Sequence, residues 1–369
     1  MFEEGARLRA ERGAASVFDF TLGNPPEQPP AGVIRTLRGL AAEEPPARHG
    51  YMPNAGYPEA REAVAARLAR RTGLPFDARH VLMTVGAAGA INTVLKAILD
   101  PGDEVIVPLP AFAEYEFYIG NHAGRMIPVE TDEAFQLDAA RVEAAITDRT
   151  KAILVNSPHN PTGVIYPAAA LRELEEMLGR TGRPITVISD EPYRELVYGD
   201  SAPPELPSLV TNAAVCYSWS KSFALAGERI GYLAISPRHH QAEELAGACT
   251  FTSRVLGYVN APAIWQRVIA GAIDAPTDVA PYREKMELFC GALERIGYQV
   301  RRPDGAFYLF PATPVPDDLA FVRRLQNEGI LAVPGRGFGR AGYMRLSLTV
   351  PRETIERAIP GFERAFRAV

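Results

Sequence analysis

Short apolar runs alternate with longer amphipathic stretches between about residue 80 and residue 236. The runs are rich in Val and Ile and have the length of buried strands: Val81–Val85, Glu104–Val107, Arg125–Val129, Ala152–Val155, Ile185–Ser189, Ala214–Tyr217 and Gly231–Ile235. Stretches between them repeat apolar residues at helical spacing: Ala87–Leu99, Ala113–His122, Leu137–Ile146 and Ala168–Leu178. This alternation predicts an α/β fold with a mostly parallel central sheet flanked by helices. Such a sheet binds its ligand at the carboxyl ends of its strands, so functional residues are expected at those positions.

The composition is that of an ordinary globular protein, with 47% apolar and 22% charged residues. A chain of 369 residues is too long for one compact core and should form about two domains. The net charge of −5 gives no basic surface for nucleic acid, and no apolar run approaches the roughly 20 residues of a membrane-spanning helix. We therefore expect neither a nucleic-acid nor a membrane partner. Cys216, Cys249 and Cys290 are odd in number and lack CxxC spacing, which favours free thiols in a cytoplasmic protein and no metal site.

The chain contains unusually few lysines. Only four occur, and arginine supplies the rest of the 39 basic residues. A lysine amine can form a Schiff base with an aldehyde, whereas a guanidinium, which stays protonated, cannot. Lys221 follows the predicted strand Ala214–Tyr217 and is the leading candidate for covalent chemistry. A solvated loop lysine is the alternative interpretation.

Two predicted strands are followed by residues that suit a flat, phosphorylated ligand. After Val81–Val85 comes the run GAAG, and small residues at the start of a helix let backbone N–H groups approach a phosphate. Close packing of the helix on the strand would use the same residues. After Glu104–Val107, Phe112 stands in a proline-rich loop, where its ring can stack on a planar ligand or fill the core.

Polar residues follow the next three predicted strands. Asn160 lies between prolines in the run HNPTG, where its amide can bind a ligand or form a plain turn. Asp190 begins the run DEPY at the end of a buried strand, where its carboxylate needs a partner unless it caps a helix. Ser218 begins the run SWSK, which ends at Lys221. Eight residues further on, Arg229 offers a fork for a dianion or for a surface ion pair.

In this order and spacing, HNPTG, DEPY and SWSK with its following arginine resemble the motifs of the class I and II aminotransferases that depend on pyridoxal phosphate. The resemblance runs over nearly the whole chain, from about Asp19 to Ser347. It implies the fold-type-I architecture of aspartate aminotransferase. A large cofactor domain is then expected over residues 46–276, with a small α+β domain formed by residues 1–45 together with 277–369.

The resemblance also implies which residues hold pyridoxal 5'-phosphate. Lys221 would form the Schiff base with its aldehyde and later shuttle protons, and Asp190 would pair with the pyridinium nitrogen. Tyr193 and Asn160 would hold the phenolic oxygen, while Phe112 would stack on the ring. The phosphate would be held near the start of the first helix and near the lysine, by Gly86, Ala87, Ala88, Ser218 and Arg229. The two alanines depart from the hydroxyl or amide side chains of many relatives, which predicts somewhat fewer phosphate contacts.

Substrate and partner residues follow from the same resemblance. Arg345 would bind the substrate α-carboxylate, with Gly23 and Asn160 beside it. Tyr51 matches a tyrosine that crosses a dimer interface to reach the phosphate of the neighbouring subunit, which predicts a homodimer with shared active sites.

Three functions are compatible with these residues. The leading one is an aminotransferase that exchanges an amino group between an amino acid and a 2-oxo acid. A β-lyase or cyclase would use the same catalytic residues on a substituted amino acid. A non-catalytic ligand-binding module is disfavoured because both Lys221 and Asp190 are present. A second arginine facing the pocket would favour dicarboxylate substrates, and Arg254, Arg336 and Arg340 are the candidates.

Overall fold

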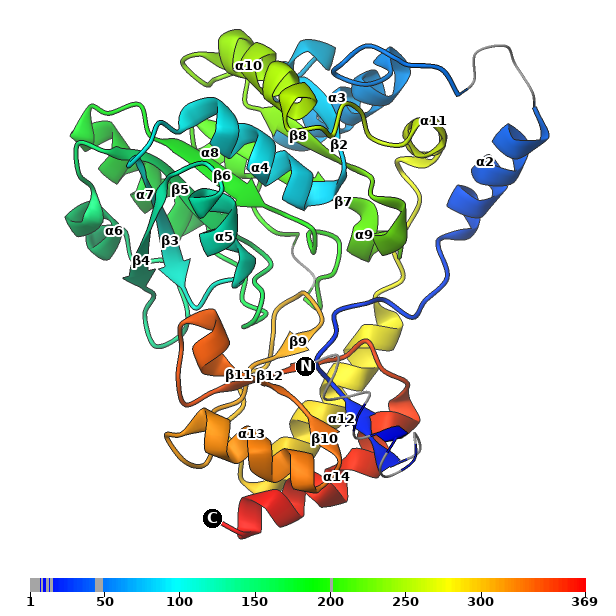
Figure 1. Ribbon diagram of the computed structural model, residues 1–369, viewed down its shortest axis with the longest axis vertical. Coiled ribbons are helices and arrows are strands. Elements are labelled where there is room, and N and C mark those ends of the chain that lie inside the picture. Colours follow the sequence, from blue (N-terminus) through cyan, green and yellow to red (C-terminus); the bar gives the residue numbers. More distant parts are fainter. Residues whose placement is uncertain (1–6, 8, 11–12, 14–15, 44–48, 200–201) are drawn as a thin grey trace.

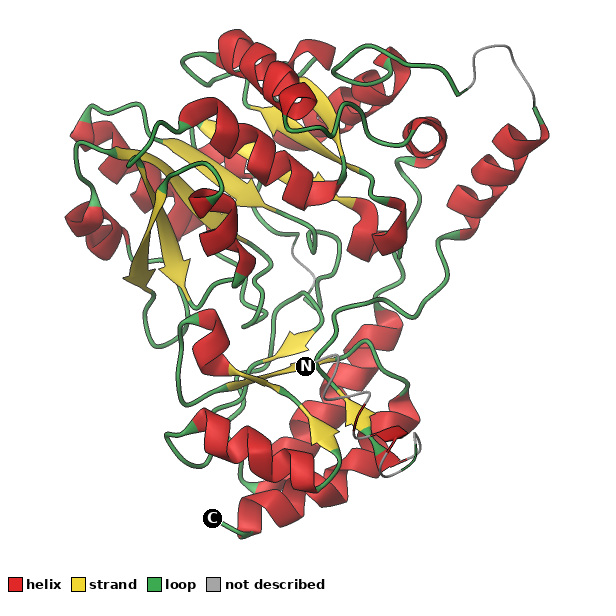
Figure 2. Cartoon of the chain, viewed as in Figure 1, coloured by secondary structure: helices red, strands yellow, loops and turns green. Residues whose placement is uncertain are grey.

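The computed structural model describes residues 7, 9–10, 13, 16–43, 49–199 and 202–369. These residues form a large part, with elements β2 to β8 and α2 to α11, and a small part, with β1, β9 to β12 and α12 to α14 (Figure 1). Helices lie on both sides of the large sheet, as Figure 2 shows. The α/β class expected from the alternation of strands and helices is confirmed.

The large part is built on a seven-stranded sheet in the order β2-β8-β7-β6-β5-β3-β4. Its strands are β2 (Val81–Thr84), β3 (Glu104–Leu109), β4 (Arg125–Glu130), β5 (Thr150–Asn156), β6 (Thr186–Asp190), β7 (Ala213–Ser218) and β8 (Gly231–Ile235). Strand β8 is antiparallel to both of its neighbours, β2 and β7, and the remaining pairs are parallel. The seven strands coincide with the seven apolar runs of the sequence, with ends that differ by at most two residues.

The central strands are buried on both faces, as expected for a parallel sheet between two helical layers. Successive side chains alternate between two cores: Ile153 and Val187 face one, whereas Leu154 and Ile188 face the other. The helices of the large part are α2 (Ala31–Ala42), α3 (Pro58–Thr72), α4 (Gly86–Ile98), α5 (Glu114–Gly120), α6 (Ala139–Ala145), α7 (Ala168–Thr181), α8 (Leu206–Leu209), α9 (Trp219–Ser222), α10 (Ala242–Val255) and α11 (Ala263–Ala272). Three of them, α4, α5 and α10, contribute to the second core, and α6, α7 and α8 contribute to the first.

The small part joins the N-terminal segment to the C-terminal third of the chain. Its strands are β1 (Phe18–Asp19), β9 (Tyr308–Leu309), β10 (Ile330–Leu331), β11 (Val333–Pro334) and β12 (Met344–Ser347), and its helices are α12 (Ala280–Ile296), α13 (Asp318–Asn327) and α14 (Arg352–Arg367). Phe20, Phe289 and Phe362 pack together in its core. Helix α2, by contrast, packs on α11 and places Val33 in a core of the large part. The boundaries predicted from the sequence, residues 46–276 for the large domain and residues 1–45 with 277–369 for the small one, stay a prediction.

Three further features bear on the class of protein. None of the helices in the described part of the chain is long and apolar enough to cross a bilayer. Among the same residues, no group of three or more His, Cys, Asp or Glu side chains could hold a metal ion. The cysteines at 216, 249 and 290 are buried and free, so the expectation of free thiols is confirmed.

Candidate active site

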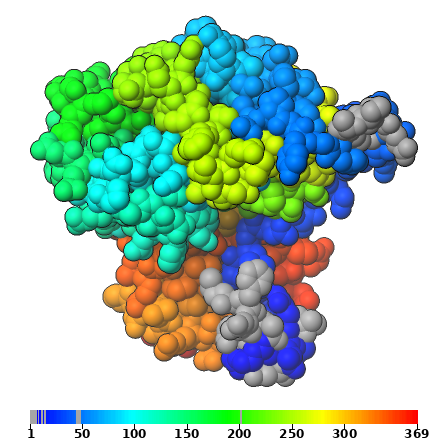
Figure 3. Space-filling model, turned by 45° about the horizontal axis from the view of Figure 1, so that its top comes forward, coloured from blue at the N-terminus to red at the C-terminus, as the bar shows by residue number. Residues whose placement is uncertain are grey.

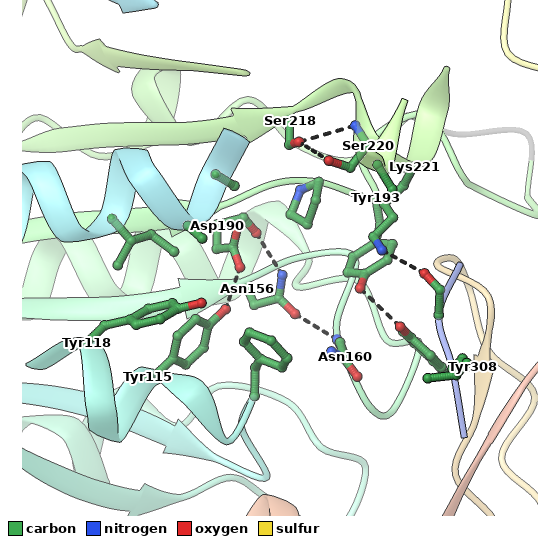
Figure 4. A pocket seen from close by; sticks show the side chains of 18 of the residues that line it. Tyr115, Tyr118, Asn156, Asn160, Asp190, Tyr193, Ser218, Ser220, Lys221 and Tyr308 are labelled. Carbon is green, nitrogen blue, oxygen red and sulfur yellow. Dashed lines mark hydrogen bonds between the residues drawn. The ribbon is translucent and has the colours of Figure 1, made fainter. Parts of the chain in front are cut away.

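Three neighbouring parallel strands end in polar residues at one edge of the sheet. Strand β5 ends at Asn156, β6 at Asp190 and β7 at Ser218. Asn156 is in register with Asp190, which is in register with Cys216. Asn156 Nδ2 also donates a hydrogen bond of 2.7 Å to the backbone oxygen of Asp190 (Figure 4). The strand register alone therefore brings these groups together at the edge where sheets of this kind bind ligands.

A cavity of about 340 Å³ opens at this edge. Its walls come from the strand ends, the first turns of α4 and α5, the Lys221 segment, the N-terminal residues 21–23 and two residues of the small part. The candidate residues that line it are Gly23, Ala87, Ala88, Phe112, Asn160, Asp190, Tyr193, Ser218, Lys221, Arg229 and Arg345. Gly86 lies just outside the lining, and Tyr51 is 96% exposed and does not contribute to the cavity in a single chain.

Lys221 reaches the cavity from a single-turn helix. Ser218 caps that helix, because its Oγ accepts a hydrogen bond of 3.1 Å from the backbone N–H of Ser220. Lys221 Nζ donates a hydrogen bond of 2.7 Å to the backbone oxygen of Gly23. Burial, together with the positive charges of Arg345 and Arg229, lowers the pKa of Lys221 to about 8. An amine with this pKa is available as a nucleophile or base near neutral pH.

Asp190 presents one satisfied and one free carboxylate oxygen. Its Oδ2 accepts a hydrogen bond of 2.6 Å from Tyr115 Oη. Its Oδ1 is buried and has no partner among the described residues. Burial raises the pKa of Asp190 to about 7, and the hydrogen bond from Tyr115 and the charge of Lys221 oppose that rise. Because a buried acceptor without a partner costs about 1–3 kcal/mol, Oδ1 marks a position where a ligand donor is favoured.

The start of α4 forms the positive end of the cavity. No side chain caps this helix, so its first backbone N–H groups remain available to an anion. Gly86 has φ +82°, and a Cβ there would lie 3.0 Å from Arg229 Nη2. Glycine therefore lets the guanidinium approach the helix start, where Nη2 donates to the backbone oxygen of Val85 at 3.1 Å. The hydroxyls of Ser218 and Ser220, 2.6 Å apart, complete a set of donors suited to a phosphate.

Arg345 is buried at the opposite side of the cavity. Its Nη1 donates to Asn160 Oδ1 at 2.9 Å and its Nη2 to the backbone oxygen of Thr21 at 2.8 Å. The guanidinium carbon lies 4.4 Å from the ring centre of Tyr308 and 4.8 Å from that of Phe338. No carboxylate pairs with Arg345 among the described residues. A buried cation without a counter-charge is costly, so the site favours a ligand that carries a carboxylate.

Tyr193, Tyr308 and Gly23 pack tightly beside this arginine. The hydroxyls of Tyr193 and Tyr308 lie 3.3 Å apart, and both side chains are buried. A Cβ on Gly23 would lie 1.9 Å from Tyr308 Oη, so a residue larger than glycine would displace the tyrosine. Glycine at this position thus allows the N-terminal segment to approach Lys221.

The arginines considered for a second carboxylate lie outside the cavity lining. Arg254 donates to Asn54 Oδ1 at 3.1 Å, and Arg340 to Glu130 at 2.8 Å. Arg336 pairs with the two aspartates at the start of α13. Within the described part of one chain, the charged arginine groups of the cavity are Arg229 and Arg345.

The structure also places in the cavity lining polar residues that the sequence did not indicate, among them Thr21, Tyr115, Asn156 and Tyr308. A signal existed for Asn156, because it ends a predicted buried strand just as Asp190 does. Tyr115 follows Phe112 by three residues, which places both at one end of a helix. For Thr21 and Tyr308 no local pattern in the sequence indicates the site.

A mostly parallel seven-stranded sheet with a partly buried lysine and a buried carboxylate at its carboxyl edge defines a transferase of fold type I. The chain belongs to the class I and II aminotransferases, because the model of that family matches residues 15–362. It is thus an aminotransferase, and the family and the architecture expected from the sequence are confirmed.

Similar proteins and similar solved structures are also aminotransferases by name. The chain is 34% identical to a probable aspartate/prephenate aminotransferase of Thermus aquaticus, over 98% of this chain and 94% of the relative. It is 33% identical to the aspartate/prephenate aminotransferase of Thermus thermophilus, over 97% of this chain and 93% of that protein. The crystal structure of an aminotransferase from Eubacterium rectale superposes with a TM-score of 0.96 at 37% identity, over 100% of this chain and 94% of the other. Thermus thermophilus aspartate aminotransferase with maleate gives a TM-score of 0.88 at 31% identity, over 99% and 96% of the two chains.

Proposed function

We propose that this aminotransferase binds pyridoxal 5'-phosphate at Lys221 and moves an amino group between an amino acid and a 2-oxo acid. The observation that carries the proposal is the presence, in one cavity, of a partly buried lysine amine of lowered pKa and a buried arginine without a carboxylate partner among the described residues. The amine suits the aldehyde of the cofactor, and Arg345 suits the carboxylate that amino acids and 2-oxo acids share.

Three features of the cavity fit the cofactor. The free Oδ1 of Asp190 offers an acceptor for a protonated ring nitrogen. The uncapped start of α4, with Gly86, Ala87 and Ala88, and the nearby Ser218 and Arg229 would hold the phosphate. Phe112 would lie on the face of the ring. The requirements of an aldehyde, a basic ring nitrogen and a dianion are therefore each met by a separate group.

The bound cofactor would supply an electron-accepting ring that stabilises negative charge on the substrate Cα. Lys221 Nζ would accept the Cα proton and later return it, since a lowered pKa leaves more of the amine neutral. Asp190, as a carboxylate, would hold the proton on the ring nitrogen. Asn160 accepts a bond from Arg345 with Oδ1, which leaves its Nδ2 to donate toward the phenolic oxygen, together with the hydroxyl of Tyr193. Arg345 would orient the substrate, with Gly23 beside it.

We further propose a homodimer whose active sites are shared between subunits. Tyr51 is 96% exposed, and the apolar side chains of Phe251 and Val255 are 65% and 54% exposed. The segment after Tyr51 is bonded to the end of α10, because Arg254 donates to Asn54 Oδ1 at 3.1 Å. Figure 3 shows the blue and yellow-green segments of the chain side by side on one face. A large exposed aromatic and exposed apolar residues in neighbouring segments support contact with a second subunit.

A cytoplasmic location is part of the proposal. The free, buried thiols of Cys216, Cys249 and Cys290 support it, because disulfides are rare in reducing compartments.

The experiment that tests the function follows the bound cofactor during the first half of the reaction. Purified, cofactor-loaded protein is mixed with single amino acids, and the conversion of the cofactor from its aldehyde to its amine form is measured by absorbance. Aspartate enters the panel of amino donors, and prephenate, a 2-oxo acid, is tested as an acceptor in the second half of the reaction, because relatives are named for them. We expect conversion, release of a 2-oxo acid and, after addition of a second oxo acid, an equal amount of new amino acid. Ammonia and pyruvate as products would instead indicate elimination.

Lys221→Ala should abolish both the conversion and the covalent attachment of the cofactor, which borohydride reduction and peptide mapping locate. Lys96→Ala, near the end of α4 and exposed, is the matched control and should behave as the wild type. A reducible linkage that persists on another lysine in Lys221→Ala would show that the assignment is wrong.

A further inference from the structure

We propose that Tyr115 is a positioning residue that fixes the orientation and the ionisation of Asp190. The inference rests on the proposed function, in which Asp190 is the partner of the cofactor ring nitrogen. Tyr115 lies in the first turn of α5, and its Oη donates a hydrogen bond of 2.6 Å to Asp190 Oδ2 (Figure 4). The contact joins two residues that are 75 positions apart in the sequence.

The geometry leaves the carboxylate a single free oxygen. Tyr115 is buried, and its ring packs edge-on against Phe112 with ring centres 5.5 Å apart. The backbone oxygen of Asp190 is held by Asn156 Nδ2. With the main chain and Oδ2 both fixed, the remaining oxygen, Oδ1, stays buried without a partner among the described residues. Tyr115 thereby prevents rotation of the carboxylate and keeps Oδ1 available to a ligand donor.

The charge of the carboxylate depends on the groups that face it. These are Tyr115 and Tyr118 from α5, Tyr193 from the segment after β6, Cys216 from β7 and Lys221 from α9. Burial favours the neutral acid and raises the pKa of Asp190 to about 7. The phenol hydroxyl opposes this rise because it donates to the ionised form. Tyr115 remains a donor at any working pH, since burial and the neighbouring carboxylate raise its own pKa far above the usual value.

Loss of the Tyr115 hydroxyl should therefore act through the ionisation of Asp190. Without the bond, the pKa of Asp190 rises further, and the neutral acid cannot stabilise a positive ring nitrogen. If the pKa of Asp190 rises by about one, the ionised fraction of Asp190 falls about eight-fold at pH 6.5 but less than about two-fold at pH 8.5. The effect of the substitution should thus be large on the acid side and small on the alkaline side.

The test measures the dissociation constant of pyridoxal phosphate for the apo-protein, by absorbance titration at pH 6.5 and pH 8.5. Four proteins are compared: the wild type, Tyr115→Phe, Asp190→Asn and the double variant. We expect Tyr115→Phe to weaken binding about three-fold to ten-fold at pH 6.5 and less than about two-fold at pH 8.5. In the Asp190→Asn background, which cannot ionise, the same substitution should change binding less than about two-fold at either pH.

The control removes a hydroxyl from another buried tyrosine. Tyr298 Oη donates to the backbone oxygen of Phe362 at 3.0 Å in the small part, away from the cavity. Tyr298→Phe should leave the pH dependence of cofactor binding unchanged. Equal weakening by Tyr115→Phe at both pH values, or in both backgrounds, would overturn the proposal and leave Tyr115 a packing residue.

A second variant covers the case in which Tyr115→Phe does not fold. Tyr115→His keeps a ring donor at this position and should retain more of the acid-side binding than Tyr115→Leu; equal losses in the two would overturn the proposal. A wild-type protein that binds no pyridoxal phosphate would contradict the proposed function itself. Normal wild-type binding without coupling between positions 115 and 190 would contradict only the role of Tyr115.

Discussion

Arg345 Nη1 donates a hydrogen bond of 2.9 Å to Asn160 Oδ1 and so connects strand β12 of the small part with the loop after β5 of the large part. The backbone N–H of Asn160 in turn donates to Asn156 Oδ1 at 2.7 Å. A third segment contributes through the backbone oxygen of Thr21, which accepts from Arg345 Nη2. The guanidinium is thus held by two hydrogen bonds from two other segments, while its charge stays unneutralised among the described residues. This arrangement is prepared for a carboxylate before the substrate arrives.

Arg345→Lys should lower kcat/KM for every amino acid and for the 2-oxo acid partner, by about ten-fold to a hundred-fold. A compact ammonium cannot reproduce the planar fork that binds a carboxylate with two parallel hydrogen bonds. The absorbance spectrum of the bound cofactor should stay almost unchanged. The kcat/KM for an amine that lacks a carboxylate should be the same in the variant and the wild type. Steady-state kinetics and the spectrum check both points.

Arg364→Lys is the matched control, because Arg364 is exposed on α14 and pairs with Glu328. Loss of cofactor and fold together in Arg345→Lys, or normal kinetics in that variant, would mean that Arg345 has a structural role only.

The capture of cofactor by the apo-protein should depend on pH in a way set by Lys221. Only the neutral amine attacks an aldehyde, and the pKa of Lys221 is lowered to about 8 by burial and by two neighbouring arginines. The rate of covalent attachment should therefore rise about ten-fold per pH unit below pH 8 and level off above it. Stopped-flow absorbance between pH 6.5 and pH 10 measures this rate. A rate that keeps rising to pH 10 would show a lysine with an ordinary pKa.

The sequence was sufficient to predict how the large sheet presents Lys221, Asp190 and Asn160. Each of them follows a short apolar run, and parallel strands end at one edge, so a local pattern and one topological rule locate all three. Arg345 is different, because only the resemblance to the family pointed to it. Its role depends on how the small part is placed against the large part, and no local pattern encodes that placement.

The partners of the Tyr115 and Tyr308 hydroxyls could not be assigned from the sequence, for a related reason. Tyr115 contacts a residue 75 positions away, and Tyr308 contacts Tyr193 across 115 positions. Each contact depends on the direction of a side chain across an interface between elements. Periodicity predicts that such a tyrosine is buried, but it does not reveal the partner of the hydroxyl.

Gly23→Ala should destabilise the protein by about 1–3 kcal/mol and lower kcat/KM. The new Cβ would lie 1.9 Å from Tyr308 Oη, so either the tyrosine or the N-terminal segment must move. Movement of that segment would also break the bond between Lys221 Nζ and the Gly23 oxygen. Urea unfolding monitored by circular dichroism gives the free energy of unfolding, and steady-state kinetics gives the catalytic effect.

Gly39→Ala is the matched control for this substitution. Gly39 lies in α2, and a Cβ there meets no atom within 4 Å, so alanine should be neutral or stabilising by about 0.5–1 kcal/mol. Adding Tyr308→Phe to Gly23→Ala should recover part of the stability, because the nearest atom is then removed. Gly23→Ala with wild-type stability would contradict the close approach of residues 23 and 308.

Subunits that share active sites should complement one another when two inactive variants are mixed. In a hybrid of a Lys221→Ala chain with a Tyr51→Ala chain, the site built on the second chain has its own Lys221 and receives Tyr51 from the first. With free exchange, half of the dimers are hybrids with one complete site each, so roughly a quarter of the wild-type activity should return. Mixing Lys221→Ala with Asp190→Asn is the matched control, since both residues lie in the cavity of a single chain and no hybrid site contains both. Equal recovery in the two mixtures, or a monomer by light scattering at the assay concentration, would rule out a shared site that depends on Tyr51.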